Sequence, residues 1–176
     1  MATKSKNTKT KSTLTTWGKT WRACLCILAP LLGGFLISLT SRNAMEQFGM
    51  LKQPPLAPPA WLFPVAWTIL YILMGIACYL ICLKYLTSKK AEKSQARTAL
   101  IIYAVQLVLN FIWTPIFFNA SLYWVALVVL IAMWILEIVL ISMAFKLSKP
   151  AFWCLLPYLL WTTFAAYLNI SIAILN

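Results

Sequence analysis

Five long runs of apolar residues constrain the fold of this chain more than any other feature. A helix needs about 20 predominantly apolar residues to cross the hydrocarbon of a bilayer. Five stretches of the 176-residue chain meet that requirement: approximately 23–41, 61–83, 99–118, 122–145 and 151–175. Only 10% of the residues are charged, whereas an average soluble domain has about 25%. We therefore predict an all-α integral membrane protein that folds as a bundle of five transmembrane helices.

The five predicted spans leave little sequence for a separate soluble domain. Residues 1–22 are rich in Lys, Ser and Thr and contain no acidic residue, a composition that cannot bury a core. We predict a disordered basic tail over 1–22 and one membrane domain over 23–176. A signal peptide or an organellar transit segment is an alternative for the tail, but the charge asymmetry of the chain favours a cytoplasmic anchor.

The basic residues are concentrated on one side of the predicted bundle. Of the 15 Lys and Arg, 13 lie before the first span, between the second and third, or between the fourth and fifth; only Arg42 and Lys52 lie on the other side. Because cytoplasmic loops are enriched in Lys and Arg, we predict the amino terminus inside and the carboxyl terminus outside. The membrane would be the plasma membrane in a bacterium and an organellar membrane in a eukaryote. Short, dispersed basic loops do not form the basic face that nucleic acids require, so no nucleic-acid partner is predicted.

A proline-rich segment leads directly into the second predicted span, in the sequence PPLAPPAWLFPVAWTILY (54–71). Proline has no N–H to donate and restricts the residue before it, so a regular helix is excluded over 54–59. The loop from 42 to 60 is also the longest connection between spans, and long loops are frequently functional. We predict a rigid lid over a pocket between the helices, formed by Pro54, Pro58, Pro59 and Trp61.

Polar side chains inside the predicted spans must find partners or face a polar cavity. Gln106, Asn110 and Trp113 follow the spacing i, i+4, i+7 and share one helix face. Interhelical hydrogen bonding and ligand contact are equal alternatives for these amides. Glu137 is the only acidic residue well inside a span. A protonated carboxyl, a side chain that snorkels to the interface and a proton-coupled transporter are three open interpretations of it.

The last span carries a second stripe, in which Trp161, Ala165 and Asn169 repeat at i, i+4, i+8. An aromatic wall, a gap and an amide suit a flat, mostly apolar ligand with a polar edge, although ordinary helix packing produces the same spacing. Metal chemistry is not indicated, because the chain has no histidine and a metal site would lack its usual ligands. We predict buried, inert thiols for the five cysteines, Cys24, Cys26, Cys78, Cys82 and Cys154.

Ordered motifs in the chain resemble the translocator protein family, also called tryptophan-rich sensory proteins or peripheral-type benzodiazepine receptors. The matching segments are PLLGGF at 30–35, LKQPPLAPPAW at 51–61, PVAWTILY at 64–71, QLVLN at 106–110 with Trp113 and PIFF at 115–118, and Pro157-Tyr158, Trp161, Phe164-Ala165 and Leu168-Asn169. The resemblance implies a five-helix bundle, usually a homodimer, with a ligand pocket closed by the first loop.

The resemblance also implies a function and a set of site residues. The family binds porphyrins such as protoporphyrin IX and haem, and animal members bind cholesterol and benzodiazepine-type drugs. The motif positions predict ligand contacts from Trp67, Asn110, Trp124, Trp161, Ala165 and Asn169. We predict a membrane binding protein for tetrapyrroles that acts as a sensor, regulator or carrier and has no resident cofactor, with other hydrophobic ligands left open as a further class.

An enzyme is the alternative that the resemblance raises. Some bacterial members are associated with light- and oxygen-dependent breakdown of protoporphyrin, and Trp67 and Trp161 would then be the catalytic residues. The chain offers no general base, nucleophile or metal constellation, so binding is the leading interpretation. The chain also departs from the family at the lid: Leu56 stands where a tryptophan is expected, and Gln47 and Phe48 occupy places often held by Trp and Tyr. Fewer lid aromatics predict weaker stacking on a porphyrin face.

Overall fold

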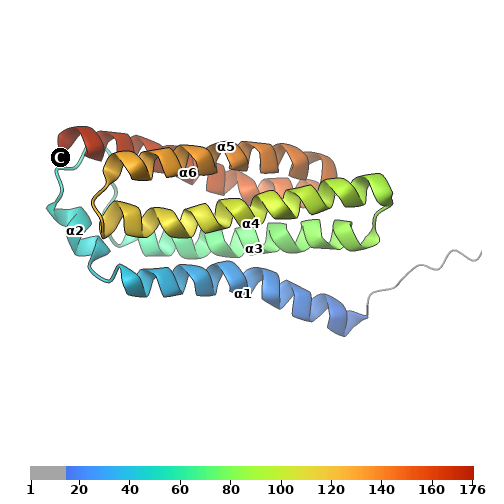
Figure 1. Cartoon of the computed structure of the whole chain (residues 1–176). Helices are drawn as coiled ribbons and strands as arrows, with labels where there is room; N and C mark the ends of the chain where they lie inside the picture. Colours follow the sequence, from blue (N-terminus) through green and yellow to red (C-terminus); the bar gives the residue numbers. More distant parts are fainter. Residues whose placement is uncertain (1–14) are drawn as a thin grey trace, which may run out of the picture.

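The structure, a computed structural model, describes residues 15–176 (Figure 1). Six helices occupy this part of the chain: α1 (Thr16–Thr40), α2 (Ala44–Met50), α3 (Leu62–Thr87), α4 (Lys90–Phe118), α5 (Tyr123–Leu147) and α6 (Lys149–Leu175). All except α2 are long and apolar enough to cross a membrane. The predicted all-α bundle of five transmembrane helices is therefore confirmed.

Two helices begin well before their predicted starting residues. α1 begins at Thr16, where Thr15 caps the first turn by accepting a hydrogen bond from the Gly18 N–H at 3.2 Å. The tail predicted over 1–22 is thus too long by seven residues, and its remainder at 1–14 lies outside the described residues. α4 begins at Lys90 rather than 99, because Lys, Glu, Gln, Arg and Ala in this segment are good helix formers that continue the helix beyond the apolar run.

The short helix α2 lies in a segment that we predicted as loop. Its seven residues are too few to show a helical period in the sequence. Figure 1 places α2 at the end of the bundle where α6 ends, between the carboxyl end of α1 and the proline segment. We call this end of the molecule, with α2 and residues 51–61, the lid end.

The helices pack around α3 and α4. α4 lies against α3 and α5, α6 lies against α5 and α3, and α1 contacts mainly α3 at one side of the bundle (Figure 1). One apolar core joins α3, α4, α5 and α6 in the half of the bundle away from the lid. A second, aromatic-rich core lies at the lid end and includes Phe48 of α2. This second core positions the candidate site.

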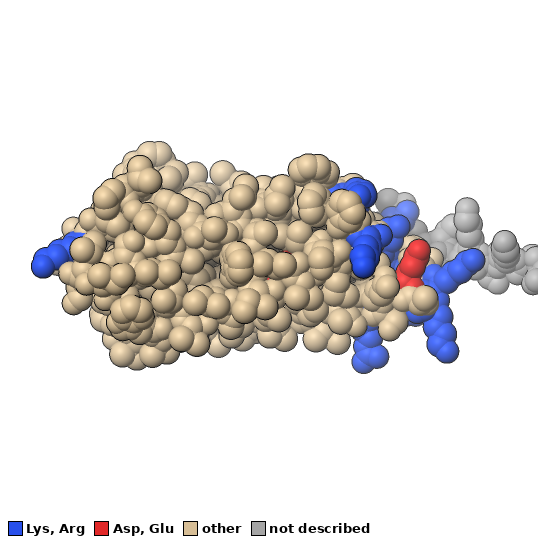
Figure 2. Space-filling view, turned by 90° about the horizontal axis from the view of Figure 1, so that it is seen from above, with Lys and Arg blue, Asp and Glu red and all other residues tan. Residues whose placement is uncertain are grey.

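The exposed charged side chains of the described residues lie at the two ends of the bundle. Figure 2 shows lysine and arginine gathered mainly at one end, fewer at the other and an uncharged surface between them. The end opposite the lid holds the start of α1, the α3–α4 connection and the α5–α6 connection, whereas Arg42 and Lys52 lie at the lid end. A belt without charge between two polar ends is the surface expected of a bundle that spans a bilayer.

Glycine allows α1 and α3 to approach each other closely. A Cβ atom added to Gly75 would lie 2.5 Å from the Ile27 Cα atom and 2.8 Å from the Cys26 carbonyl oxygen. Both neighbours are backbone atoms, so neither can move away without moving α1. Small residues at such contacts are the usual means of packing helices in lipid.

We expect Gly75→Ala to destabilise the protein, because the new methyl group must push α1 away from α3. Overpacking of this kind costs about 1–3 kcal/mol, and the higher helix propensity of alanine offsets about 1 kcal/mol of it. Thermal unfolding in detergent micelles measures the effect. Gly49→Ala is the matched control, since a Cβ atom there has no neighbour within 4 Å; equal melting temperatures for the two variants would contradict this account of the α1–α3 contact.

Candidate ligand site

The lid end is closed by α2 and by part of the proline segment. Phe48 of α2 is 2% exposed and packs edge-on against Phe63, with ring centroids 4.8 Å apart. Pro54 and Pro58 are buried, as expected of lid residues, whereas Pro59 and Trp61 are exposed. The closure therefore depends on Phe48, which the sequence indicated only as a weak substitute for a larger aromatic residue.

Hydrogen bonds from Tyr167 of α6 and from Asn176, which follows α6, attach residues 51–61 to this end of the helix. The side-chain amide of Asn176 pairs with the backbone of Lys52, accepting from its N–H at 2.9 Å and donating to its carbonyl at 3.1 Å. The Tyr167 hydroxyl donates to the Pro55 carbonyl at 2.6 Å. The segment is thus held in place both by its prolines and by hydrogen bonds to one helix.

Leu56 lies at the turn of the lid and faces away from the bundle. The Ala57 N–H donates to the Pro54 carbonyl at 3.2 Å, and Leu56 has φ 69°. Proline at the second position and a positive φ at the third define a type II turn, in which glycine is normally preferred at the third position. The Leu56 side chain is 83% exposed, so it does not reach the space beneath the lid.

A small cavity lies beneath the lid. Its volume is about 20 Å³, which is room for about one water molecule. Trp113 forms part of its wall and stacks on Phe117 with ring centroids 5.0 Å apart. Ala165 and Asn169, both predicted site residues, line the same space. The full lining is Phe48, Phe63, Trp113, Phe117, Phe118, Ala165, Leu168, Asn169 and Ile172.

The predicted amides bind other helices in this closed form. Asn110 is 2% exposed; it accepts from the Tyr71 hydroxyl at 2.7 Å and donates to the Tyr158 hydroxyl at 2.9 Å. Asn169 accepts from the Trp113 indole N–H at 3.1 Å and donates to the Tyr123 carbonyl at 2.9 Å. Of the two alternatives left open by the sequence, the structure displays interhelical hydrogen bonding.

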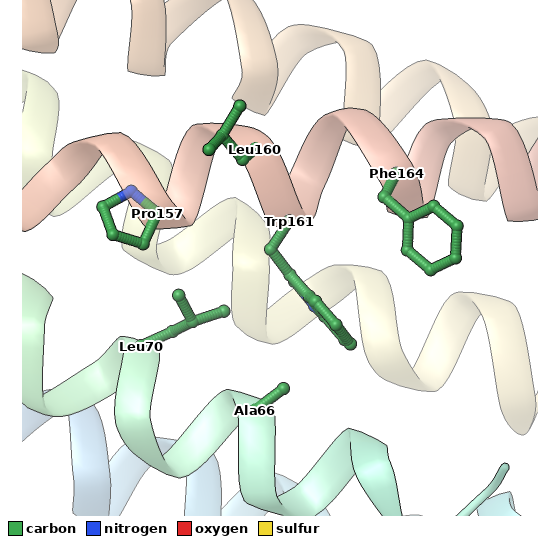
Figure 3. Close-up of a pocket in the computed structure, with 6 residues that line it drawn as sticks. All are labelled: Ala66, Leu70, Pro157, Leu160, Trp161 and Phe164. Carbon is green, nitrogen blue, oxygen red and sulfur yellow. The ribbon is translucent and has the colours of Figure 1, made fainter. Parts of the chain in front are cut away.

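A groove on the outer surface between α3 and α6 has a volume of about 380 Å³ (Figure 3). The Trp161 ring points from α6 toward α3 along this groove. The other lining residues are Ala66, Leu70, Pro157, Leu160 and Phe164. Trp161 also contacts Phe63, with ring centroids 6.0 Å apart, and Phe63 lines the cavity under the lid. The Trp161–Phe63 pair therefore lies between the groove and the cavity.

Trp67 occupies a third position, beside the hydrogen bonds of Asn110. It is half-buried and packs against Tyr71 and Tyr158 with centroid separations of 5.5 and 6.2 Å. Trp67 and Asn110 thus share both neighbours. Trp161, Ala165 and Asn169 form the other group, along the cavity and groove.

The structure does not bring Trp124 into either group. It is 59% exposed on the first turn of α5, and its neighbour Tyr123 faces the cluster instead, packing on Phe117 at 5.1 Å. Successive residues on a helix point about 100° apart, so only one of the two can face inward. The predicted contact of Trp124 with a ligand under the lid has no support in this geometry.

Sequence reasoning omitted several residues that form the site. Trp113 shares its face with Asn110, but that spacing alone assigns it no role. Tyr71 lies one turn after Trp67, and Tyr158 lies about one turn before Trp161. Each phenol therefore shares a helix face with a predicted site residue, and this spacing was a usable signal. Phe63 gave none, and Phe48 gave only the family resemblance of its lid position, because the placement of both rings depends on how the loop folds back.

The cysteines take no part in this arrangement. All five are free; Cys24 is exposed and the other four are of intermediate burial. The prediction of buried thiols is thus wrong for Cys24, because that face of α1 is directed at the surroundings of the bundle, and the other four thiols are only partly buried. In residues 15–176, no group of three or more Cys, Asp or Glu side chains is placed to hold a metal ion.

The match to known proteins covers almost all of the bundle. The sequence pattern of the TspO/MBR family fits residues 26–175. The chain belongs to this family. It is 40% identical over 154 residues to the tryptophan-rich protein TspO of Chlorobaculum tepidum, covering 86% of this chain and 94% of that protein. It is 36% identical over 131 residues to the tryptophan-rich sensory protein of Cereibacter sphaeroides (74% and 77% covered), and 36% identical over 143 residues to the translocator protein of Bos taurus (81% and 82% covered).

We expect Asn110→Ala to destabilise this TspO-family protein by about 1–3 kcal/mol, because two buried tyrosine hydroxyls lose their shared partner. The measurement is the thermal midpoint in micelles. Asn43→Ala is the control, since the Asn43 side chain is exposed and makes no capping bond. A midpoint unchanged by Asn110→Ala would show that the hydrogen bonds of Asn110 to Tyr71 and Tyr158 contribute little to stability.

Proposed function

We propose that this TspO-family protein binds a flat, mostly apolar ligand, a tetrapyrrole such as protoporphyrin IX, from within the membrane and acts as its sensor, regulator or carrier. One observation carries the proposal: the Trp161–Phe63 pair lies between a groove open to the bilayer and an aromatic cavity under the lid. The names of relatives, which include sensory proteins and translocator proteins, agree with sensing or carrying. The choice of a tetrapyrrole as the ligand rests on the family resemblance.

The two volumes define where a ligand fits. Small-molecule pockets measure about 300–1,000 Å³; the groove of about 380 Å³ is in that range, and the cavity of about 20 Å³ is far below it. A ligand that reaches Ala165 and Asn169 must therefore separate Trp161 from Phe63 or displace Phe48. Binding then joins the groove and the cavity into one pocket.

The surroundings of that pocket match the chemistry of a flat aromatic ligand. The indole of Trp161 provides an aromatic face, and offset or edge-on aromatic contacts contribute about 0.5–1.5 kcal/mol each beyond area burial. The Trp113 indole N–H now donates to the Asn169 side-chain oxygen. A polar group at the edge of a ligand could take the place of one of these two residues and bond the other. Opening the lid costs the bonds of Tyr167 and Asn176, at about 0.5–1.5 kcal/mol net each.

Orientation, membrane and assembly are parts of the same proposal. The excess of basic residues at the end opposite the lid supports a cytoplasmic location for that end, with the lid on the outer side. The plasma membrane in a bacterium, or an organellar membrane in a eukaryote, follows from that orientation. A homodimer is proposed from the family resemblance. The apolar residues exposed along α1, Leu25, Leu28, Leu32, Phe35 and Leu36, are compatible with contact to lipid or to a second copy.

We expect Trp161→Phe and Ala165→Leu each to weaken protoporphyrin IX binding at least tenfold, a loss of about 1.4 kcal/mol. The first shrinks the aromatic face and the second fills the gap beside it. Titration of purified protein with protoporphyrin IX, followed by tryptophan fluorescence quenching, gives the affinity. Trp153→Phe is the matched control on the same helix, because Trp153 is 64% exposed. If the folded wild-type protein shows no saturable quenching, the proposal fails.

Light-driven degradation of the porphyrin is the second candidate, because Trp67 contacts two tyrosines that are linked through Asn110. Oxidisable rings in contact can donate electrons to an excited ligand, and the oxygen that the reaction consumes is the final electron acceptor. We expect porphyrin absorbance under illumination in air to decay more slowly with Trp67→Phe/Trp161→Phe than with wild type when equal amounts are bound. Equal decay in both would eliminate this candidate and leave the binding function standing.

A further inference from the structure

Glu137 is buried at the centre of the membrane bundle without a basic partner. Its side chain is 1% exposed and lies about 21 Å along α5 from Tyr123 and about 15 Å from Leu147, at 1.5 Å per residue. The chain has no histidine, and no Lys or Arg occurs between residues 98 and 145 or after 149. A carboxylate charge at this depth would be uncompensated, which is costly in hydrocarbon.

The hydrogen bonds around Glu137 indicate where a neutralising proton would lie. The Thr162 Oγ1 atom is 2.7 Å from Glu137 Oε2 and 3.1 Å from each of the Tyr158 and Leu159 carbonyl oxygens. A threonine hydroxyl has one hydrogen but can also accept. If Oε2 carries a proton, the carboxyl donates to Thr162 and Thr162 donates to a carbonyl of its own helix. The Oε2 proton and the Thr162 hydroxyl hydrogen then each have an acceptor in a single arrangement.

The second carboxyl oxygen supports the same assignment. Glu137 Oε1 has no hydrogen-bond partner among the described residues. A buried carboxylate would carry charge on this oxygen and require donors to it, whereas the carbonyl oxygen of a neutral acid requires much less. We propose that Glu137 is a proton-binding site, which holds a neutral carboxylic acid at the centre of the bundle and donates from Oε2 to Thr162.

The groups near this site are phenols and amides. From α6, the Tyr158 carbonyl oxygen lies 3.1 Å from Thr162 Oγ1, and the Tyr158 hydroxyl donates to the Gln106 side-chain oxygen on α4 at 2.9 Å. From α3, Tyr71 reaches the same cluster through Asn110. The proton site is therefore joined by hydrogen bonds to the residues beside Trp67, but its existence does not depend on any ligand.

The composition of the chain allows a direct test by infrared spectroscopy. The three acidic residues are Glu46, Glu92 and Glu137, with no aspartate, and Glu46 and Glu92 are exposed at the ends of the bundle. In the double variant Glu46→Gln/Glu92→Gln, Glu137 is the single acidic side chain left. We expect this full-length protein in phosphatidylcholine vesicles at neutral pH to show the C=O stretching band of a protonated carboxyl that shifts when glutamate is isotopically labelled. A labelled spectrum with only ionised carboxylate bands, from protein that retains its helical circular dichroism, would overturn the proposal.

Substitutions at the partner test the direction of the hydrogen bond. Thr162→Val removes the acceptor and should raise the frequency of the carboxyl band, whereas Thr162→Ser should leave it near the wild-type position. Glu137→Gln should abolish the band. An unchanged frequency in Thr162→Val would contradict donation to Thr162. These readouts need no porphyrin, so they succeed or fail independently of the binding function.

Thermal stability gives a second measurement with a definite sign. A proton held in the native protein is released more readily from the unfolded chain, so raising the pH from neutral to alkaline should lower the melting temperature of wild type more than that of Glu137→Gln. The exposed-site variant Glu92→Gln should follow wild type. Parallel pH profiles for wild type and Glu137→Gln would count against a buried proton.

Discussion

The absence of water in the bilayer core is the constraint on which this structure depends. A polar side chain there must find its partner within the protein, and the bundle meets this requirement with bonds between helices. Asn110 joins α4 to α3 and α6, Trp113 joins α4 to Asn169 on α6, and Glu137 joins α5 to Thr162 on α6. The residues that hold the helices together are thus the same residues that give the interior its chemistry.

This double use of the interior polar residues explains why the candidate site has little free space. The amides that would contact a ligand already have hydrogen-bond partners: Asn110 bonds two tyrosines and Asn169 bonds an indole. Phe48 and Phe63 fill the space under the lid. A ligand must therefore displace existing interactions, because no empty cavity of its size is present under the lid. Affinity then depends on the free energy of opening as well as on the interactions that the ligand itself makes, which suits a protein that releases or reports its ligand.

Much of the fold follows from the sequence, because a span of about 20 apolar residues has few alternatives in lipid. The same property limits what can be predicted about the site. Between Tyr123 and Glu137, α5 is apolar on every face, so the local pattern does not distinguish the inward Tyr123 from the outward Trp124. The stripe of Trp161, Ala165 and Asn169 could be recognised because an amide interrupts it. α2 and the burial of Phe48 could not, since they arise when the loop folds back on the bundle. Thr162 escaped notice because a threonine in a span ordinarily bonds its own backbone.

α6 is the one helix common to every feature of the interior. Tyr167 and Asn176 attach it to the lid, Trp161 and Asn169 border the groove and the cavity, and Thr162 contacts the central carboxyl. A rotation or slide of this helix would therefore disturb the lid contacts, the groove, the cavity and the carboxyl site together. A spectroscopic label placed near its middle would therefore report events at the outer face and at the bilayer centre with the same signal.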